Sequence, residues 1–305
     1  MAQEQTPRGI IDNRFLASLS TLDLCVRSVR GGQLGGARRS GTHGSSIEWL
    51  DHREYMPGDD LRRLDWSLVG RFDKYYIRRF VDERQLQTNI YIDMSGSMDW
   101  QDEGHKGEMV LKLAAALGFL SISNMDRLSY RLLRGSTCRA LCPPLLDKDA
   151  FLNAALQLSS LTFCGETDLY ASIASDPSAG NGGGLSFILT DLLTDSDWKA
   201  AVDLLLCRRR EVALIQVLSP READPFCGGS LHFLDCESPV GDESKSQRIE
   251  VDRSALEAYA LAFAAWQADI AAFCKKRGVG YLSILSDESI EDIILKKGMA
   301  AGIIR

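Results

Sequence analysis

The feature that most constrains this chain is an apolar, β-branched run at residues 88–92 that passes directly into Asp93-x-Ser95-x-Ser97. The run predicts a buried strand. Because alternate residues of an extended chain point the same way, the carboxylate and the two hydroxyl groups can converge on one point. Gly96 lacks a Cβ where the backbone must turn sharply. Three such oxygen donors favour a hard divalent cation, above all Mg²⁺, although the same residues can instead cap a following helix.

Two later segments place further oxygen atoms at comparable positions. Thr167 lies in a polar turn at residues 165–170, and a second apolar run, residues 185–190, ends in Asp191. Ligand sites of open α/β sheets lie at the carboxyl ends of strands. We therefore expect a cage in which five side chains meet around one ion, either Mg²⁺ or, as alternatives, Mn²⁺ or Ca²⁺. The five are Asp93, Ser95, Ser97, Thr167 and Asp191.

Predicted strands and helices alternate along most of the chain, which favours an α/β fold with a mostly parallel sheet flanked by helices. We divide the chain into residues 1–86, with an N-terminal helix, a Gly- and Arg-rich loop and a β-rich segment, and residues 87–305, the α/β domain. The β-rich segment is expected to hold strands at residues 47–55 and 64–80. Two short strands near 228–252 predict a β-hairpin inserted in the second domain.

A long helix is expected to begin near residue 252, and its apolar side chains recur at helical spacing. We interpret this apolar stripe as core rather than as a cofactor site. The stripe consists of Leu256, Tyr259, Phe263, Trp266, Ile270 and Phe273.

Composition argues against several classes of protein. The chain has 305 residues, of which 45% are hydrophobic and 25% charged, as is typical of globular proteins. Its net charge of −7 argues against nucleic-acid binding or membrane-surface binding as the main function. Basic residues crowd residues 53–84, but acidic residues are interleaved with them. An internally paired, solvated face is therefore at least as good an interpretation of this segment as a site for an acidic partner.

The sequence also bears on location and redox chemistry. No apolar segment follows the polar residues 1–8, so no signal peptide is expected, and no uncharged run reaches the ~18 residues of a membrane span. We therefore expect a cytoplasmic protein without a membrane span. The eight Cys residues form no CxxC pair, which argues against a zinc site and against a disulfide framework.

The spacing of Asp93-x-Ser95-x-Ser97, followed by Thr167 and Asp191, resembles the metal-ion-dependent adhesion site of von Willebrand factor A domains. An upstream block resembles the bacterial family catalogued as domain of unknown function 58, in which such a block directly precedes an A-type domain. The block comprises Glu54-Tyr55-x-Pro57-Gly58-Asp59-Asp60-x-Arg62-x-Leu64-Asp65-Trp66 and Arg71-Phe72-Asp73-Lys74-Tyr75-Tyr76-Ile77-Arg78-Arg79-Phe80. The resemblance spans about residues 35–300.

This resemblance implies a von Willebrand factor A-like fold and metal-dependent protein binding without catalysis. A carboxylate of a partner protein would complete the coordination of the metal ion. Relatives are typically encoded beside MoxR-type AAA+ ATPases. The resemblance therefore also implies an adaptor that works with such an ATPase in protein remodelling or complex maturation.

Two alternative functions stay open. A strand that ends in Asp near Mg²⁺ also fits a phosphatase-like hydrolase, but the second acid that such enzymes carry two residues later is replaced here by Ser95. Residues 94–98 also lack the GxSxG pattern of a serine nucleophile. We therefore expect a non-enzymatic module, with a Mg²⁺-dependent hydrolase and a metal-free structural scaffold as the alternatives.

Overall fold

The computed structural model describes residues 24, 49–56, 61, 64–72, 74–80, 86–100, 104–179, 183–225, 229–233 and 247–304. The chain divides into two compact units, Val26–Gln85 and Leu86–Arg305 with Met1–Cys25. The predicted division into domains after residue 86 stays a prediction. The predicted N-terminal helix and the Gly- and Arg-rich loop lie outside the described residues, apart from Leu24.

A six-stranded sheet forms the centre of the larger unit, in the order β10-β7-β6-β3-β4-β5. All neighbouring strands pair in parallel except β4 and β5, which form an antiparallel hairpin. The prediction of a mostly parallel sheet is therefore confirmed. The strands are β3 (Gln87–Asp93), β4 (Arg127–Arg134), β5 (Thr137–Ala140), β6 (Gly184–Thr190), β7 (Arg210–Leu218) and β10 (Gly280–Leu285).

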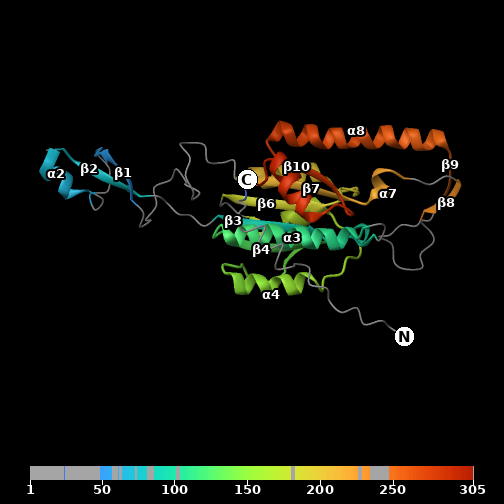
Figure 1. Ribbon diagram of the computed structural model, residues 1–305, viewed down its shortest axis with the longest axis horizontal. Helices are drawn as coiled ribbons and strands as arrows, with labels where there is room; N and C mark the ends of the chain where they lie inside the picture. The colour runs from blue at the N-terminus through green and yellow to red at the C-terminus, as the bar shows by residue number, and fades with distance from the viewer. Residues whose placement is uncertain are drawn as a thin grey trace. The chain divides into compact units, whose positions relative to one another are not determined.

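Helices cover both faces of this sheet (Figure 1). On one face lie α3 (Lys106–Ser123) and, packed against it, α4 (Lys148–Leu158). On the other face lie α5 (Leu169–Ala174), α6 (Trp198–Cys207) and α8 (Arg253–Arg277). The shorter helical segments are η2 (Gly96–Asp99), η3 (Pro177–Ala179), α7 (Pro220–Ala223), α9 (Ile290–Asp292) and η5 (Ile293–Gly298).

Acidic N-caps fix where four of these helices begin. Asp147, Asp168, Asp197 and Asp252 each accept a hydrogen bond from the backbone N–H three residues further on, ahead of α4, α5, α6 and α8. Such caps satisfy an N–H group that the helix itself leaves unpaired. The cap at Asp168 also fixes the end of the turn that carries Thr167, one of the predicted site residues.

The core on the α5, α6 and α8 face is built by alternate residues of the strands. Tyr91 of β3, Ile188 of β6 and Leu214 of β7 all belong to this apolar cluster. On the opposite face α3 lies close to the sheet, because a Cβ at Gly118 would come within 1.9 Å of the Tyr130 hydroxyl oxygen. The Tyr130 hydroxyl donates to the Ala114 carbonyl at 3.2 Å, so this tight contact is also hydrogen-bonded.

In the smaller unit, β1 (Trp49–Glu54) pairs antiparallel with β2 (Tyr76–Phe80). The predicted strand at residues 64–80 is only partly correct, because the helix α2 (Trp66–Phe72) occupies its first half. Asp65 explains this helix, since its carboxylate accepts hydrogen bonds from the Ser67 backbone N–H and from the Ser67 hydroxyl, as at a helix start.

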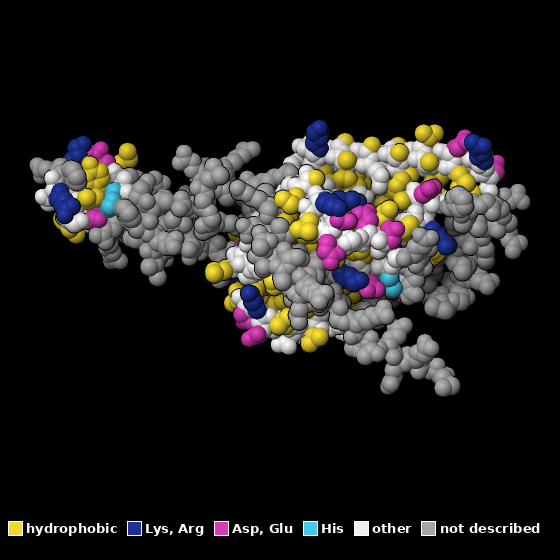
Figure 2. Space-filling view, in the orientation of Figure 1, with side chains coloured by type: hydrophobic (Ala, Val, Ile, Leu, Met, Phe, Trp, Pro, Cys, Tyr) yellow, Lys and Arg dark blue, Asp and Glu magenta, His cyan; other side chains and the backbone are white. Residues whose placement is uncertain are grey.

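The predicted hairpin near residues 228–252 is confirmed as β8 (Gly229–Phe233) paired antiparallel with β9 (Gln247–Val251). The prediction for α8 holds only for its C-terminal half, where Ile270 and Phe273 are buried. In the N-terminal half of the stripe, Tyr259 is 41% exposed, and Leu256 and Phe263 are only half-buried. Figure 2 shows hydrophobic side chains along the visible length of this helix, with basic side chains at its two ends. The apolar stripe is therefore core at one end only.

Candidate metal centre

The predicted site lies at the edge of the sheet where β3 and β6 end. Asp93 is the last residue of β3, and Asp191 directly follows β6, the neighbouring strand. The Ser95 backbone N–H donates to Asp93 Oδ1 at 3.0 Å, and the hydroxyl oxygens of Ser95 and Ser97 are 3.0 Å apart. All four residues are buried. The local turn therefore brings one carboxylate and two hydroxyl groups together, as the sequence predicts.

The turn that carries Thr167 is fastened to this first turn by backbone hydrogen bonds. The Gly96 N–H donates to the Gly165 carbonyl at 2.8 Å, and the Cys164 N–H donates to the Met94 carbonyl at 2.9 Å. The Thr167 hydroxyl donates weakly to a backbone carbonyl of β4 and also lies close enough to the Asp93 carboxyl to lower its pKa. Thr167 therefore lies beside the Asp-x-Ser-x-Ser turn.

A glycine allows this loop to approach α3. A Cβ at Gly107 would come within 2.4 Å of the Phe163 ring, so only glycine accommodates the ring against the helix. Phe163 is buried, and it lies four residues before Thr167 in the same loop. The close packing of this ring thus helps to hold the Thr167 turn against the first turn of α3.

Among the described residues, Asp93 lies beside neutral donors and not beside a cation. Burial, followed by repulsion from the Asp191 carboxylate, raises the pKa of Asp93 to about 6. Hydrogen bonds from the Thr190 hydroxyl and the Ser95 N–H oppose this rise, as does the nearby Thr167 hydroxyl. Within the described part of the chain, no Lys, Arg or His forms an ion pair with Asp93, and its donors are all neutral. The buried carboxylate is therefore electrostatically uncompensated.

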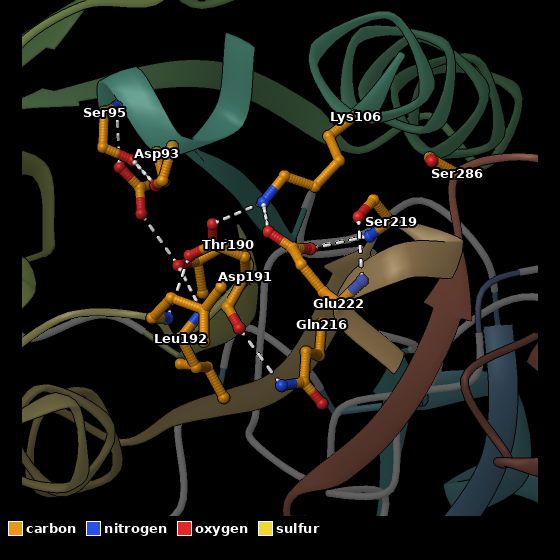
Figure 3. Close-up of polar contacts among 12 residues, drawn as sticks. Asp93, Ser95, Lys106, Thr190, Asp191, Leu192, Gln216, Ser219, Glu222 and Ser286 are labelled. Carbon is orange, nitrogen blue, oxygen red and sulfur yellow. Dashed lines mark hydrogen bonds and ion pairs between the residues drawn. The ribbon is translucent and has the colours of Figure 1, made fainter. Parts of the chain in front are cut away.

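Asp191, in contrast, is paired with a buried ammonium group. Lys106 Nζ lies 2.8 Å from Asp191 Oδ2 and 2.7 Å from Glu222 Oε1, and the Lys106 side chain is fully buried (Figure 3). Burial lowers the pKa of Lys106, but the two carboxylates outweigh burial and hold the pKa above its usual value. The ammonium group therefore stays charged, and it links the first residue of α3 to the end of β6 and to α7.

The backbone around Asp191 is held in an unusual conformation. Leu192 has a positive φ of 63°, which is uncommon for a residue other than glycine. The Leu193 N–H donates to Asp191 Oδ1 at 3.0 Å, and the Gln216 side-chain amide donates to the Asp191 carbonyl at 3.1 Å. The Leu192 N–H donates to the Thr190 hydroxyl oxygen, and that hydroxyl in turn donates to Asp93 Oδ2 at 2.8 Å. These contacts fix both carboxylates in place, as is common at functional sites.

All five predicted cage residues lie at this edge of the sheet, and their role as ligands stays a prediction. Sequence reasoning missed Thr190, Lys106 and Glu222. Lys106 carries a detectable signal, because a basic residue at the first position of a helix opposes the helix dipole and requires an explanation. Glu222 carries another, because Ser219-x-x-Glu222 after a strand is a capping box.

The donor set is unlike that of a site built from charged ligands. Among the residues that the structure describes, no three His, Cys, Asp or Glu side chains are grouped so that they could hold a metal ion. Three of the five predicted ligands are instead hydroxyl groups, which are ligands for hard cations. The assignment of a metal to this edge therefore stays a prediction.

The model of the family described as "Protein of unknown function DUF58" matches residues 51–264. The uncharacterized protein Rv1480 of Mycobacterium tuberculosis (strain H37Rv) is 28% identical over 293 residues, which is 94% of this chain and 90% of that protein. Another uncharacterized protein, Mb1516 of Mycobacterium bovis, is 28% identical over the same length.

Two solved structures are similar in fold. The conserved hypothetical protein BatB from Bacteroides thetaiotaomicron is 16% identical with a TM-score of 0.43, covering 72% of this chain and 97% of that chain. The SpRpn10 VWA domain is 11% identical with a TM-score of 0.38, covering 70% of this chain and 95% of that chain. The mostly parallel sheet with helices on both faces is an α/β fold, as the sequence predicts. Within the described ranges, no helix has the length and apolar character needed to cross a membrane.

Proposed function

Because the chain belongs to the family described as Protein of unknown function DUF58, we propose that it is a non-enzymatic, metal-dependent protein-binding module. The von Willebrand factor A-like fold suggests a protein-interaction module. The dependence on metal and the choice of partner are the parts of the proposal that go beyond this fold.

The observation that carries the proposal is the excess negative charge at the buried edge. The cluster of Asp93, Asp191, Glu222 and Lys106 holds three carboxylates and one ammonium group, which leaves a net charge of −2. Burying charge without a counter-ion is costly, so a divalent cation is the ligand that this edge fits best.

The residues present fit such an ion. Ser95, Ser97 and Thr167 would hold it through their hydroxyl oxygens, and the carboxylates of Asp93 and Asp191 would hold it directly or through water. A bound Mg²⁺ would supply a Lewis-acidic position that attracts a carboxylate from a partner protein. Because the hydroxyl ligands are neutral, they would leave much of the positive charge of the metal available for that carboxylate.

The proposed binding partner is a protein that presents an acidic side chain to the metal. We also propose that the module acts together with a MoxR-type AAA+ ATPase. The ATPase rests on the family resemblance alone, and no residue of this chain identifies it. A cytoplasmic location stays a prediction of the sequence. The most informative candidate is therefore the MoxR-type ATPase encoded in the same genome, together with its client.

A pull-down with that ATPase, in excess Mg²⁺ or in EDTA, tests the proposal directly. We expect binding in Mg²⁺, loss of binding in EDTA, and loss of binding for Asp93→Ala and Ser95→Ala at unchanged circular dichroism. Ser160→Ala is the matched control, because Ser160 is exposed and its hydroxyl contacts only a nearby carbonyl. Binding that persists in EDTA would favour the metal-free structural scaffold. Hydrolysis of a generic phosphate ester in the presence of Mg²⁺ would favour the hydrolase.

A further inference from the structure

Lys106 is a fully buried lysine at the start of a helix. It is 0% exposed, and it begins α3, where a positive charge opposes the helix dipole. Burying an ammonium group is costly unless its partners are well placed. Two carboxylates meet this need, one at the end of β6 and one in α7 (Figure 3). Placing the Lys106 ammonium group here therefore costs free energy, and packing of the side chain alone does not explain why a lysine occupies the position.

The two carboxylates that contact Lys106 are not equivalent. Asp191 is buried, and both of its oxygens are engaged, Oδ1 by the Leu193 N–H and Oδ2 by the ammonium group. Glu222 is partly exposed and fixed independently, because its Oε2 accepts the Ser219 N–H in the capping box of α7. A cation that ligates Asp191 through Oδ2 must therefore compete with Lys106.

We propose that Lys106 is the resident cation of this edge, which neutralises Asp191 in the metal-free domain and gives Asp191 up when a divalent ion binds. Glu222 retains the ammonium group in the metal-bound domain, so Lys106 keeps one carboxylate partner throughout. This inference rests on the proposed function, because it concerns the same metal edge. It makes Lys106 and Glu222 positioning residues that set the affinity for the ion without contacting it.

The exchange has a consequence that a purely structural role lacks. Removing the ammonium group frees Asp191 and removes a repulsive charge, so affinity for the ion rises. Removing the Glu222 charge leaves Asp191 as the sole anionic partner of Lys106, so affinity for the ion falls. A structural ion pair predicts that both changes loosen the site and weaken binding alike.

Calorimetric titration of the full chain with MgCl₂, repeated with MnCl₂, measures these effects. We expect Lys106→Met to bind about tenfold more tightly than the wild type, and Glu222→Gln to bind about tenfold more weakly. Lys112→Met is the matched control, because Lys112 lies on the same helix in an exposed ion pair with Glu108. It should bind as the wild type does.

Lys106→Met leaves two carboxylates without a cation and can fail to fold in the absence of metal. The double variant Lys106→Met/Glu222→Gln removes one charge of each sign and keeps the net charge of the cluster at −2. We expect it to bind Mg²⁺ more tightly than the wild type and to gain more thermal stability from Mg²⁺. Binding weaker than that of the wild type would overturn the proposal.

The outcomes separate this inference from the proposed function. If the wild type binds Mg²⁺ and Asp93→Ala does not, but Lys106→Met and Glu222→Gln shift affinity in the same direction, the exchange is wrong and the metal site stands. If neither the wild type nor any variant binds Mg²⁺ or Mn²⁺, the metal site is wrong and the exchange fails with it. Opposite shifts in the two variants support both.

Discussion

Two buried charge clusters of the larger unit differ in how their charges are balanced. The edge cluster, Asp93, Asp191, Glu222 and Lys106, lies at the carboxyl ends of the strands and has more carboxylates than cations. The inner cluster consists of Asp176, Arg131, Arg210 and Tyr91, and it has more cations than carboxylates.

The inner cluster is arranged as a structural network. Asp176 accepts hydrogen bonds from the hydroxyls of Tyr91 and Ser178, both at 2.8 Å, and lies 3.6 Å from an Arg131 nitrogen. Arg210 donates to backbone carbonyls of β3 and β6 at 2.7 and 2.6 Å. The single carboxylate of the inner cluster, that of Asp176, is thus paired with a cation and with hydroxyl donors. Arg131 Nε and Arg210 Nη1 have no hydrogen-bond partner among the described residues.

The difference between the two clusters shows how a candidate binding site can be distinguished from a structural network within one sheet. A carboxylate that is paired with a cation and with hydroxyl donors stabilises the fold. Asp93 has hydroxyl donors but no cation among the residues that the structure describes, and its charge is repelled by Asp191, so it costs stability in the metal-free chain. Function is expected where a buried carboxylate lacks a cation, as at Asp93.

The largest effect should come from breaking the inner cluster. Asp176→Ala leaves two buried guanidinium groups without a carboxylate, and we expect it to lower the free energy of unfolding by about 3–5 kcal/mol. Urea unfolding in EDTA measures this loss. Asp93→Asn is the comparison, because it removes an uncompensated charge and should leave stability unchanged or raise it. Equal losses in the two variants would remove the distinction between the clusters.

The next effect is a pH dependence that belongs to the edge cluster. The pKa of Asp93 is about 6 in the folded chain against 3.8 for an ordinary Asp, so the folded state binds more protons than the unfolded state between these values. The free energy of unfolding of the metal-free chain should therefore fall as pH rises from about 4 to 6, by on the order of 3 kcal/mol from this group.

Asp93→Asn should flatten that part of the pH profile, while Tyr91→Phe in the inner cluster should leave its slope unchanged. Thermal or urea unfolding in EDTA across this range gives the two profiles. A slope that survives in Asp93→Asn would show that Asp93 is not the group that titrates.

Added metal should stabilise the chain through the edge cluster only, by somewhat less than the pH effect of Asp93. Mg²⁺ at about 100 times its dissociation constant should stabilise the wild type by about 2.7 kcal/mol, because the ion binds only the folded chain. Tyr91→Phe should gain the same increment, and Ser97→Ala should gain less. Differential scanning fluorimetry in Mg²⁺ and in EDTA measures these shifts, and an equal gain in Ser97→Ala would exclude its hydroxyl as a ligand.

The smallest effects come from single hydroxyl donors, one in each cluster. Tyr91→Phe removes a donor to Asp176, and Thr190→Val removes a donor to Asp93. Each should cost about 1–2 kcal/mol, the usual range for a hydrogen bond to a charged group. For Thr190→Val the loss of the acceptor for the Leu192 N–H should cost stability at every pH, and a further cost should appear above about pH 6, where Asp93 is ionised. For Tyr91→Phe the cost should be the same at neutral and mildly acidic pH. Unfolding at pH 5 and 7.5 tests this contrast.

The sequence predicts the parts of the site that depend on local spacing and on strand ends. Asp93, Ser95 and Ser97 follow from alternation along one turn, and Asp191 follows from the rule that parallel strands end at one edge. Lys106 and Glu222 could not be assigned in this way, because their contacts join residues 85 and 116 positions apart and no periodic pattern records the pairing.

The same limit applies to the fold. The alternation of strands and helices predicts the parallel sheet because it is repeated along the chain. Helix α2 was predicted as strand because its aromatic and β-branched residues resemble a strand, while the Asp65 contacts that start the helix are individual hydrogen bonds. The apolar stripe of α8 is periodic along its whole length, but periodicity does not predict which half of the helix packs against the sheet.

The most direct test of the central claim is anomalous diffraction from crystals of the chain grown in Mn²⁺. The account predicts one strong anomalous peak beside the hydroxyl oxygens of Ser95, Ser97 and Thr167, absent in crystals of Asp93→Asn. A Mn²⁺ peak elsewhere on the chain, or density at this edge that persists in Asp93→Asn, would contradict it.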